Sequence, residues 1–260
     1  MPVAEAPAPV KVPILAPGPA SGGIGIKAAF SPRPGGVALD MDVANGGAVP
    51  VRMIQIQFNK SPFGLAPAGQ PAIQFAPPLL PGNVMATSLP LAAGLPQMLA
   101  PYAGPSPNGP PHVVPVQIAF KNADTGAVFY AAAGLPFDAL WSSDGVVDRS
   151  AFIANWKAIA DDLETYSTVS DLPTGSSIEA ASAKLQARNA FYVARRSVPN
   201  QPAGTEVVYF SIKTVGTNDQ FLVELTFKQG LNACKVCVKT TAQPFAQLAK
   251  AAIESILRGP

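Results

Sequence analysis

The sequence predicts two parts of different fold class, an antiparallel β-sandwich followed by a smaller α+β subdomain. Of the 29 prolines, 23 fall within residues 1–115, and the texture of the chain changes near residue 146. Before that point, short runs alternate apolar and polar residues between Pro- and Gly-rich turns, which is typical of a sandwich. After it, amphipathic helices and strands are mixed, which favours an antiparallel sheet with flanking helices.

The first part divides into a linker and the sandwich itself. Residues 1–22 are rich in Ala, Pro and Gly and predict a semi-rigid, disordered linker, and residues 23–146 form the sandwich. The stretch 94–115 is a Pro-rich loop without a period of its own. The runs "GVALDMDVAN", "RMIQIQFNK" and "VQIAFK" are expected to turn inward Val37, Leu39, Met41, Val43, Ile54, Ile56, Phe58, Val116, Ile118 and Phe120.

Residues 147–260 form the α+β subdomain. Asp148 can cap a helix over "RSAFIANWKAI", and Ser176 with Glu179 has capping-box spacing before a second helix. Two strands follow, "TEVVYFSIK" and "QFLVELTFK", and then a strand in "NACKVCVK". A last amphipathic helix is expected to turn Phe245, Ala249, Ala252 and Ile256 to one side.

Composition excludes several classes of function. The chain has 260 residues, 48% of them apolar, so it can bury a sizeable core. A net charge of +2 with only 13% charged residues is too little for a nucleic-acid footprint or a basic membrane-surface tract. The N-terminus lacks the apolar run of a signal peptide, and the chain has no run of about 18 apolar residues. We therefore expect a soluble protein on the cytosolic side.

The residues that carry chemistry are few. Cys234 and Cys237 form a lone CxxC on a predicted strand, where positions three apart face opposite ways, so two ordinary strand cysteines are the simpler interpretation. His112 is the only histidine, which makes a hydrolytic triad or a histidine-rich metal site hard to assemble. We expect no catalytic residue, no metal and no cofactor. A thiol oxidoreductase that uses the two cysteines is the alternative from another class.

Three outward positions of the second part are unusual. Tyr209 stands on the outward face of its strand, and Glu224 is outward on the next, so the two share a surface if these strands pair as a hairpin. Trp156 lies four residues after Phe152 on the expected helix. That spacing suits helix core, and the sequence alone leaves open whether Trp156 is core or part of a surface that grips a partner.

The sandwich has a comparable patch. Outward polar positions of two strands and a nearby tyrosine combine uncharged polar groups, a lysine and an aromatic ring. Such a patch suits peptide binding, and an ordinary solvated sheet face is the other interpretation. Its residues are Gln57, Asn59, Ala119, Lys121 and Tyr130.

The run "IQFNKSPFG" (56–64) resembles the appendage, or ear, of the β-adaptin large subunit of heterotetrameric clathrin adaptor complexes. The resemblance continues in order through "FKNADTGAVFY", "GLPFDALWSSDGVVDRSAFIANWKAI", "SAKLQARNAFYVARRSV", "VVYFSIK", "FLVELTF" and "ESILRG", over nearly the whole chain. It implies an N-terminal immunoglobulin-like β-sandwich followed by a C-terminal α+β platform subdomain. It also implies a non-enzymatic hub without cofactors that binds short peptide motifs.

The resemblance further implies two peptide sites. The platform site consists of Trp156, Lys157, Glu164, Arg196, Tyr209 and Glu224. The sandwich side site consists of Gln57, Asn59, Ala119, Lys121 and Tyr130. The aromatic platform suits the apolar face of a partner helix, and its carboxylates suit a partner arginine. On this basis Trp156 is expected to grip a partner.

The implied partners are endocytic accessory proteins, cargo adaptors, the clathrin heavy chain and, through a trunk absent from this chain, the other adaptor subunits. The implied location is cytoplasmic and peripheral on clathrin-coated membranes, at plasma-membrane coated pits or the trans-Golgi network. The appendage of another coat subunit, the α-adaptin ear or a COPI-type appendage, is the alternative within the same superfamily.

Overall fold

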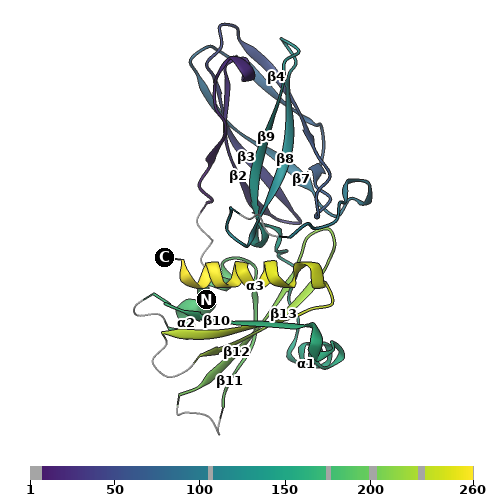
Figure 1. The fold of residues 1–260 in the computed structure, drawn as a ribbon, viewed down its shortest axis with the longest axis vertical. Helices are drawn as coiled ribbons and strands as arrows, with labels where there is room; N and C mark the ends of the chain where they lie inside the picture. The colour runs from purple at the N-terminus through teal and green to yellow at the C-terminus, as the bar shows by residue number, and fades with distance from the viewer. Residues whose placement is uncertain (1–7, 105–107, 174–176, 199–203, 228–231, 260) are drawn as a thin grey trace. The chain divides into compact units, whose positions relative to one another are not determined.

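The computed structural model (Figure 1) describes residues 8–104, 108–173, 177–198, 204–227 and 232–259, which form two compact units. The sandwich unit holds residues 8–103 and 114–135, and the platform unit holds the other described residues. The predicted order, a β-sandwich followed by an α+β subdomain, is confirmed.

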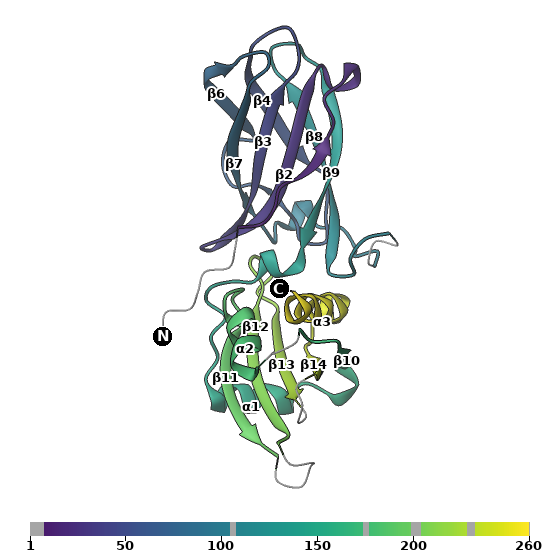
Figure 2. The ribbon, with the colours of Figure 1, turned by 90° about the vertical axis from the view of Figure 1, so that its left-hand side faces the viewer.

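Two antiparallel sheets form the sandwich unit (Figure 2). One has the strand order β1-β2-β3-β7-β5 and the other the order β6-β4-β8-β9. The strands of the first sheet are β1 (Val12–Leu15), β2 (Ile24–Arg33), β3 (Gly36–Asn45), β5 (Ala66–Pro67) and β7 (Val84–Ala92). Those of the second are β4 (Val51–Phe58), β6 (Ala72–Leu79), β8 (Val113–Asn122) and β9 (Val128–Pro136), and two 3₁₀ turns, η1 (Pro19–Ser21) and η2 (Pro96–Met98), complete the unit.

The inner faces of these sheets are the alternating apolar positions. On β4, Ile54, Ile56 and Phe58 are buried while Gln55 and Gln57 are exposed, because successive side chains point to opposite faces. The inward positions expected on β3 and β8 are buried in the same way. The alternation in the sequence therefore placed the core of this unit correctly.

The expectation of a disordered linker over residues 1–22 is wrong for its second half. Val12 pairs with Ala28 in an antiparallel ladder between β1 and β2, and Lys11 Nζ donates to Asp42 Oδ1 on β3 over 2.6 Å. An edge strand needs only one partner, so Pro13 is tolerated there although it has no N–H to donate. Residues 1–7 of the expected linker lie outside the described residues.

The boundary between the two parts also differs from the one expected at residue 146. After Leu135, the last residue of the sandwich unit, the chain enters the platform unit at Pro136. Phe137, in the 3₁₀ turn η3 (Phe137–Leu140), packs edge-to-face on Phe221 with ring centroids 5.6 Å apart. The residues from 136 to 146 therefore pack with the second unit, although their composition resembles the first.

The platform unit is built on a five-stranded antiparallel sheet of order β10-β14-β13-β12-β11. α3 lies along one face of it (Figures 1 and 2), and Phe245 of α3 stacks on Phe137. Its strands are β10 (Glu164–Ser170), β11 (Phe191–Ser197), β12 (Glu206–Lys213), β13 (Gln220–Phe227) and β14 (Ala233–Lys239). Its helices are α1 (Arg149–Ala158), α2 (Ile178–Gln186) and α3 (Gln243–Arg258), with the 3₁₀ turn η4 (Asp161–Leu163).

Details of the helices depart from expectation. Ser177, not Ser176, caps α2, because its Oγ accepts from the backbone N–H of Ala180; Ser176 itself lies outside the described residues. On α3 the buried side is wider than the expected stripe and displaced from it, because the helix packs on β14, β10, η3 and α2 together. Ala249 and Ala252 are buried as expected, Phe245 and Ile256 are only half-buried, and Ala246, Leu248, Ala251, Ile253 and Leu257 complete the buried side.

No helix within the described ranges is both long and apolar enough to cross a bilayer.

Candidate functional site

A groove on the platform unit, between α1 and the sheet, is the candidate site. It has a volume of about 460 Å³. One side comes from α1, and the floor and the other side come from β11, β12 and β13. We call it the platform groove, and its lining residues are Arg149, Phe152, Ile153, Trp156, Lys157, Val193, Ala194, Arg195, Arg196, Tyr209 and Glu224.

The floor of the groove is a straight row across the sheet. Antiparallel pairing sets Ala194 opposite Tyr209, Tyr209 opposite Glu224, and Glu224 opposite Cys237. Directly paired residues of neighbouring strands point to the same face, so these side chains lie side by side. The sequence-based expectation that Tyr209 and Glu224 share one surface is confirmed. The neighbouring row, Ser211, Leu222 and Lys239, is fully buried.

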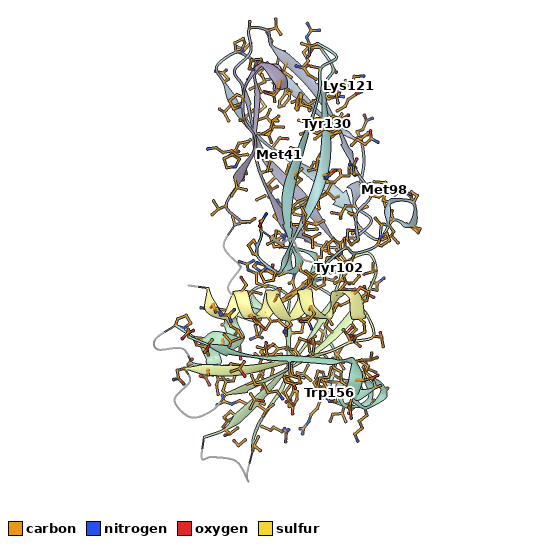
Figure 3. All side chains as sticks on the ribbon, viewed as in Figure 1. Met41, Met98, Tyr102, Lys121, Tyr130 and Trp156 are labelled. Atoms are coloured by element: carbon orange, nitrogen blue, oxygen red, sulfur yellow. The ribbon has the colours of Figure 1, made fainter. Side chains whose placement is uncertain are left out.

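α1 holds the aromatic side of the groove. Asp148 caps the helix, since its Oδ1 accepts from the N–H of Ala151 at 2.9 Å, as the sequence predicts. Phe152 is buried and fastens α1 to the sheet, with its ring centroid 5.5 Å from that of Tyr209. One turn later, Trp156 is only half-buried and lines the groove at the end of α1 (Figure 3).

Trp156 is fixed on three sides while part of its ring stays open. It stacks on Phe152 at a centroid distance of 5.6 Å and meets Tyr209 edge-on at 6.5 Å. The ammonium of Lys239 lies 5.5 Å from the centre of its ring. An aromatic ring held in one orientation loses little entropy when it binds, and this suits a contact surface. Of the two interpretations of Trp156, the half-buried position favours the surface over full core.

Tyr209 is oriented by a charged neighbour. The Arg196 Nε–H donates to its phenolic oxygen at 2.8 Å, and the guanidinium lies 5.8 Å from the ring centre. Burial is the main cause that raises the pKa of Tyr209 above its usual value, so the hydroxyl stays neutral near pH 7. A neutral hydroxyl beside Glu224 can both donate and accept at the floor of the groove.

Positive side chains line the groove on both α1 and β11. Arg195 is paired with Glu179 and Glu206, at 2.7 and 2.8 Å. Arg149 and Lys157 form no ion pair with any carboxylate of the described residues. Their charges are available to a partner, so the α1 side of the groove favours acidic side chains.

Lys239 supports the groove from below, a role that was not predicted from the sequence. Its side chain is only 2% exposed, whereas its ion-pair partner Asp161, 2.7 Å away in η4, is 98% exposed. Buried lysines are rare unless paired. The pair joins η4 to β14, and the same ammonium faces the ring of Trp156. No local sequence pattern predicts this role, because a lysine at the end of a strand is normally exposed to solvent.

Glu164 is the one expected platform residue that does not line the groove. It begins β10 at the edge of the sheet, paired with Lys239. The pKa of the Cys237 thiol is raised, mainly by burial and next by a hydrogen bond with the Glu164 carboxylate. Glu164 therefore reaches the far end of the floor row instead of the aromatic part.

The other lining residues were not predicted from the sequence, although Arg149, Ile153 and Trp156 follow helical spacing. They are Arg149, Ile153 and Val193 to Arg195.

The cysteines do not form a redox pair. Cys234 and Cys237 are both buried and unpaired, on opposite faces of β14. Burial raises the pKa of Cys234 to about 12, and the pKa of Cys237 is raised as well. Reactive thiols need the opposite, a lowered pKa and access to solvent. The structure thus argues against the oxidoreductase alternative.

On the sandwich unit the expected side patch is a continuous exposed strip. Gln57 pairs with Ala119 across β4 and β8. A hairpin hydrogen bond from the Asn122 N–H to the Ala127 carbonyl sets the register of β8 and β9, which brings Tyr130 beside Ala119. Tyr130 is 74% exposed, and Figure 3 shows it near Lys121. Asn59 sits at the end of β4, where its amide donates to Gln117.

The start of the Pro-rich loop is ordered. Four backbone hydrogen bonds, at 2.8 to 3.1 Å, join residues 94–100 to Ser61, Phe63 and Gly64. Gly64 has φ +54°, and a Cβ there would lie 2.7 Å from the Leu95 carbonyl oxygen, so the close approach needs glycine. Residues 105–107 of this loop lie outside the described residues.

A β-sandwich followed in sequence by an α+β platform that carries an aromatic groove defines a protein of the appendage class. A family model described as "Beta2-adaptin appendage, C-terminal sub-domain" matches residues 142–257. The chain is 33% identical over 238 residues to the AP-1 complex subunit beta-1 of Mus musculus and 32% identical over 241 residues to that of Homo sapiens, in each case over 91% of this chain. It is 25% identical to the AP-1 complex subunit beta of Dictyostelium discoideum, over 92% of this chain.

Residues 142–257 are thus similar to the C-terminal subdomain of the β2-adaptin appendage, and nearly the whole chain is similar to AP-1 β subunits. The chain spans 23% of the length of these relatives.

Proposed function

We propose that this chain is the appendage of an adaptor-complex β subunit and recruits accessory proteins, cargo adaptors and clathrin by binding short peptide motifs during formation of clathrin-coated vesicles. On this proposal it is a binding module without catalytic activity. It acts in the cytoplasm, peripheral to clathrin-coated membranes, at plasma-membrane coated pits, the trans-Golgi network or both.

The observation that carries the proposal is the platform groove. Half-buried Trp156 and Tyr209 face a space of about 460 Å³ that no described side chain fills. An amphipathic helix with Phe and Leu anchors suits such a groove, because it can bury an apolar face against aromatic rings.

Charge gives the bound helix a direction. Arg196 lies on β11 at one end of the strand order, while Glu224 on β13 and Glu164 on β10 lie toward the other end. A peptide with acidic residues before its anchors and an arginine after them would match both ends. Trp156, Lys157, Arg196, Tyr209 and Glu224 are the proposed contacts in the groove, with Glu164 at the acidic end.

The side patch of Gln57, Asn59, Ala119, Lys121 and Tyr130 is proposed as a second, weaker peptide site. Its polar residues on neighbouring strands and its exposed tyrosine suit an extended peptide segment. Each site alone would bind weakly. Many copies on one coat would raise the avidity, because later contacts become intramolecular.

Calorimetric titration tests the proposal. The ligand is a helical peptide with Phe and Leu anchors, an acidic N-terminal flank and a C-terminal arginine. It is titrated into the wild-type chain, Trp156→Ala and Tyr130→Ala, with folding checked by circular dichroism. Micromolar binding that is lost in folded Trp156→Ala and kept in Tyr130→Ala is expected. If the wild type does not bind, or if Trp156→Ala binds equally well, the groove is not the recruitment site for this class of peptide.

A further inference from the structure

A proline-rich segment at the edge of the sandwich unit belongs to neither proposed site. β6 is an edge strand of its sheet (Figure 2). Its ladder with β4 is irregular between Val51 and Met53, where Arg52 alone stands opposite residues 75–78. The extra residues of β6 bulge away from the ladder. We call residues 77–81, of sequence PPLLP, the proline ridge.

The proline ridge is exposed and uncharged. Pro77, Pro78 and Pro81 are exposed, and Leu80 is 51% exposed. Residues 61–120 contain no Lys, Arg, Asp or Glu, so contacts made by the side chains of the ridge are apolar. A contiguous exposed apolar surface commonly marks a binding site.

The sequence of the ridge favours the polyproline II conformation. Proline fixes its own φ near about −65°, and a residue that precedes a proline, as Pro77 and Leu80 do, is restricted to the extended region. After Leu80 the chain turns, with Gly82 at φ +79° and the Asn83 N–H donating to the Leu80 carbonyl at 3.1 Å. Pro81 thus stands at the second position of a type II turn, where the backbone is also extended.

Burial along the ridge follows the three-residue period of polyproline II. Positions 77 and 80 share one edge of such a helix, positions 78 and 81 share the second, and position 79 lies on the third. Leu79 is 1% exposed, whereas the residues of the other two edges are exposed. Aromatic-lined grooves that bind PxxP segments cover two edges and leave the third free. The ridge therefore presents to solvent the two edges that such a groove covers.

Buried Asn45 holds the ridge in place. Asn45 is 2% exposed, and its amide donates to the Leu79 carbonyl at 2.9 Å. Its own carbonyl accepts from the Gly82 N–H at 2.6 Å. A segment that is fixed before binding loses less conformational entropy when it binds.

Two features beside the ridge complete the surface. A hollow of about 380 Å³ lies between the ridge and the start of β7, where Val84 is 64% exposed, and an aromatic side chain of a partner can enter it. Arg52 stands opposite the bulge, and its side chain is 77% exposed. Its Nε lies 3.7 Å from the Asp124 carboxylate, and so exposed an ion pair contributes little. The guanidinium can therefore pair with an acidic side chain of a partner.

We propose that the proline ridge is a docking site for a domain of the SH3 type. The aromatic-lined groove of that domain covers the two exposed edges of the ridge, and an acidic side chain at the end of the groove meets Arg52. The ridge shares no residue with the platform groove or the side patch. It thus adds a second class of partner, a folded domain, to the short peptides of the proposed function.

The test is calorimetric titration of the chain with a panel of isolated SH3 domains that have an acidic side chain at the end of the aromatic groove. The proteins are the wild type, Leu80→Ser, Pro78→Ala, Arg52→Gln and Val128→Ser. Val128 is the matched control, since it is 49% exposed on β9 of the same unit and lies outside the ridge. All four side chains are exposed, so the variants should fold, and circular dichroism checks this.

At least one domain is expected to bind the wild type, and a free PxxP peptide with a flanking arginine should displace the chain, because both occupy the aromatic groove. Leu80→Ser and Pro78→Ala are each expected to weaken binding by about 10-fold or more, since they remove anchors at the centre of the contact. Arg52→Gln is expected to weaken it by about 2- to 5-fold. Val128→Ser is expected to bind as the wild type does.

The proposal is wrong if no domain of the panel binds the wild type, or if Leu80→Ser binds as tightly as the wild type. Sedimentation of the wild type alone tests another occupant: a dimer that Leu80→Ser dissociates would make the ridge an interface between copies and exclude the proposal. Trp156→Ala should bind the SH3 domain unchanged, so a failure of the platform groove to bind its peptide is distinguishable from a failure of the ridge.

Discussion

Alanine variants of Trp156 and Trp141 distinguish a residue that contacts a partner from a residue of the core. Trp156→Ala removes a stack on Phe152, an edge contact with Tyr209 and the cation contact of Lys239. Each aromatic pair contributes about 0.5–1.5 kcal/mol and a cation–π contact about 0.5–2 kcal/mol, and part of the ring is in water in either state. We therefore expect Trp156→Ala to lower the free energy of unfolding by about 1–3 kcal/mol and to leave the platform folded.

Trp141 provides the matched control. It is 1% exposed in the platform unit, so Trp141→Ala leaves a cavity and should cost about 3–5 kcal/mol. The assay is urea unfolding followed by far-UV circular dichroism and by the fluorescence of the remaining tryptophan, which in both variants reports on the platform unit. If Trp156→Ala lowers the free energy of unfolding as much as Trp141→Ala, or unfolds the platform, Trp156 is a core residue and not a contact for a partner.

Three further predictions follow from buried groups. Lys239→Met should change the free energy of unfolding by no more than about 1 kcal/mol, because methionine fills the same space and the lost partner Asp161 is in water. The same variant should weaken peptide binding in calorimetry, because Trp156 loses the contact that holds its ring. Unchanged affinity would show that Lys239 does not support the groove. The native thiols should resist alkylation near neutral pH and react once the chain is unfolded in urea, and fast native labelling would restore the oxidoreductase alternative. The pKa of Cys234 rises from 9.0 to about 12 on folding, so between these two pH values the thiol ionises only in the unfolded chain. The contribution of this thiol to the free energy of unfolding is therefore fully present below pH 9 and is lost as the pH rises above 9. Between pH 8 and 10 wild type should lose about 1 kcal/mol more than Cys234→Ala, and equal losses would contradict the buried thiol.

The sequence predicts those parts of the fold whose strands have one buried face. β4 and β8 alternate apolar and polar residues because one side meets the core and the other meets water, and the expected inward residues are buried. β10 could not be found in this way. Among its residues only Val169 is fully buried, because β10 is an edge strand of the sheet beside α3 and buries few side chains. Its sequence therefore shows no alternation of apolar and polar residues.

Other parts depend on partners distant in the sequence. β1 lies in an Ala- and Pro-rich stretch that predicts a linker, and it is a strand because β2 supplies an edge to pair with. η3 packs on β13 and α3 and so belongs to the platform unit, which composition alone does not show. In such places long-range contacts outweigh local propensity.

The candidate site was predictable in its aromatic part. The outward parity of Tyr209 and Glu224 is visible in the strands, and the register then places them directly opposite one another. Trp156 could not be assigned from helical spacing alone, because Phe152 and Trp156 follow the same stripe; only the fold shows that Phe152 is buried and Trp156 half-open. Lys239 lies far from α1 in sequence and comes to the site only through strand order.

The most direct test of the central claim uses the two indole N–H signals of the chain, which has two tryptophans. A ¹⁵N-labelled sample is titrated with the helical peptide that has Phe and Leu anchors and a C-terminal arginine, and the two signals are assigned with Trp156→Phe. The Trp156 indole signal is expected to shift progressively to saturation while that of buried Trp141 stays in place. An unmoved Trp156 signal, or equal movement of both, would contradict a peptide bound in the platform groove.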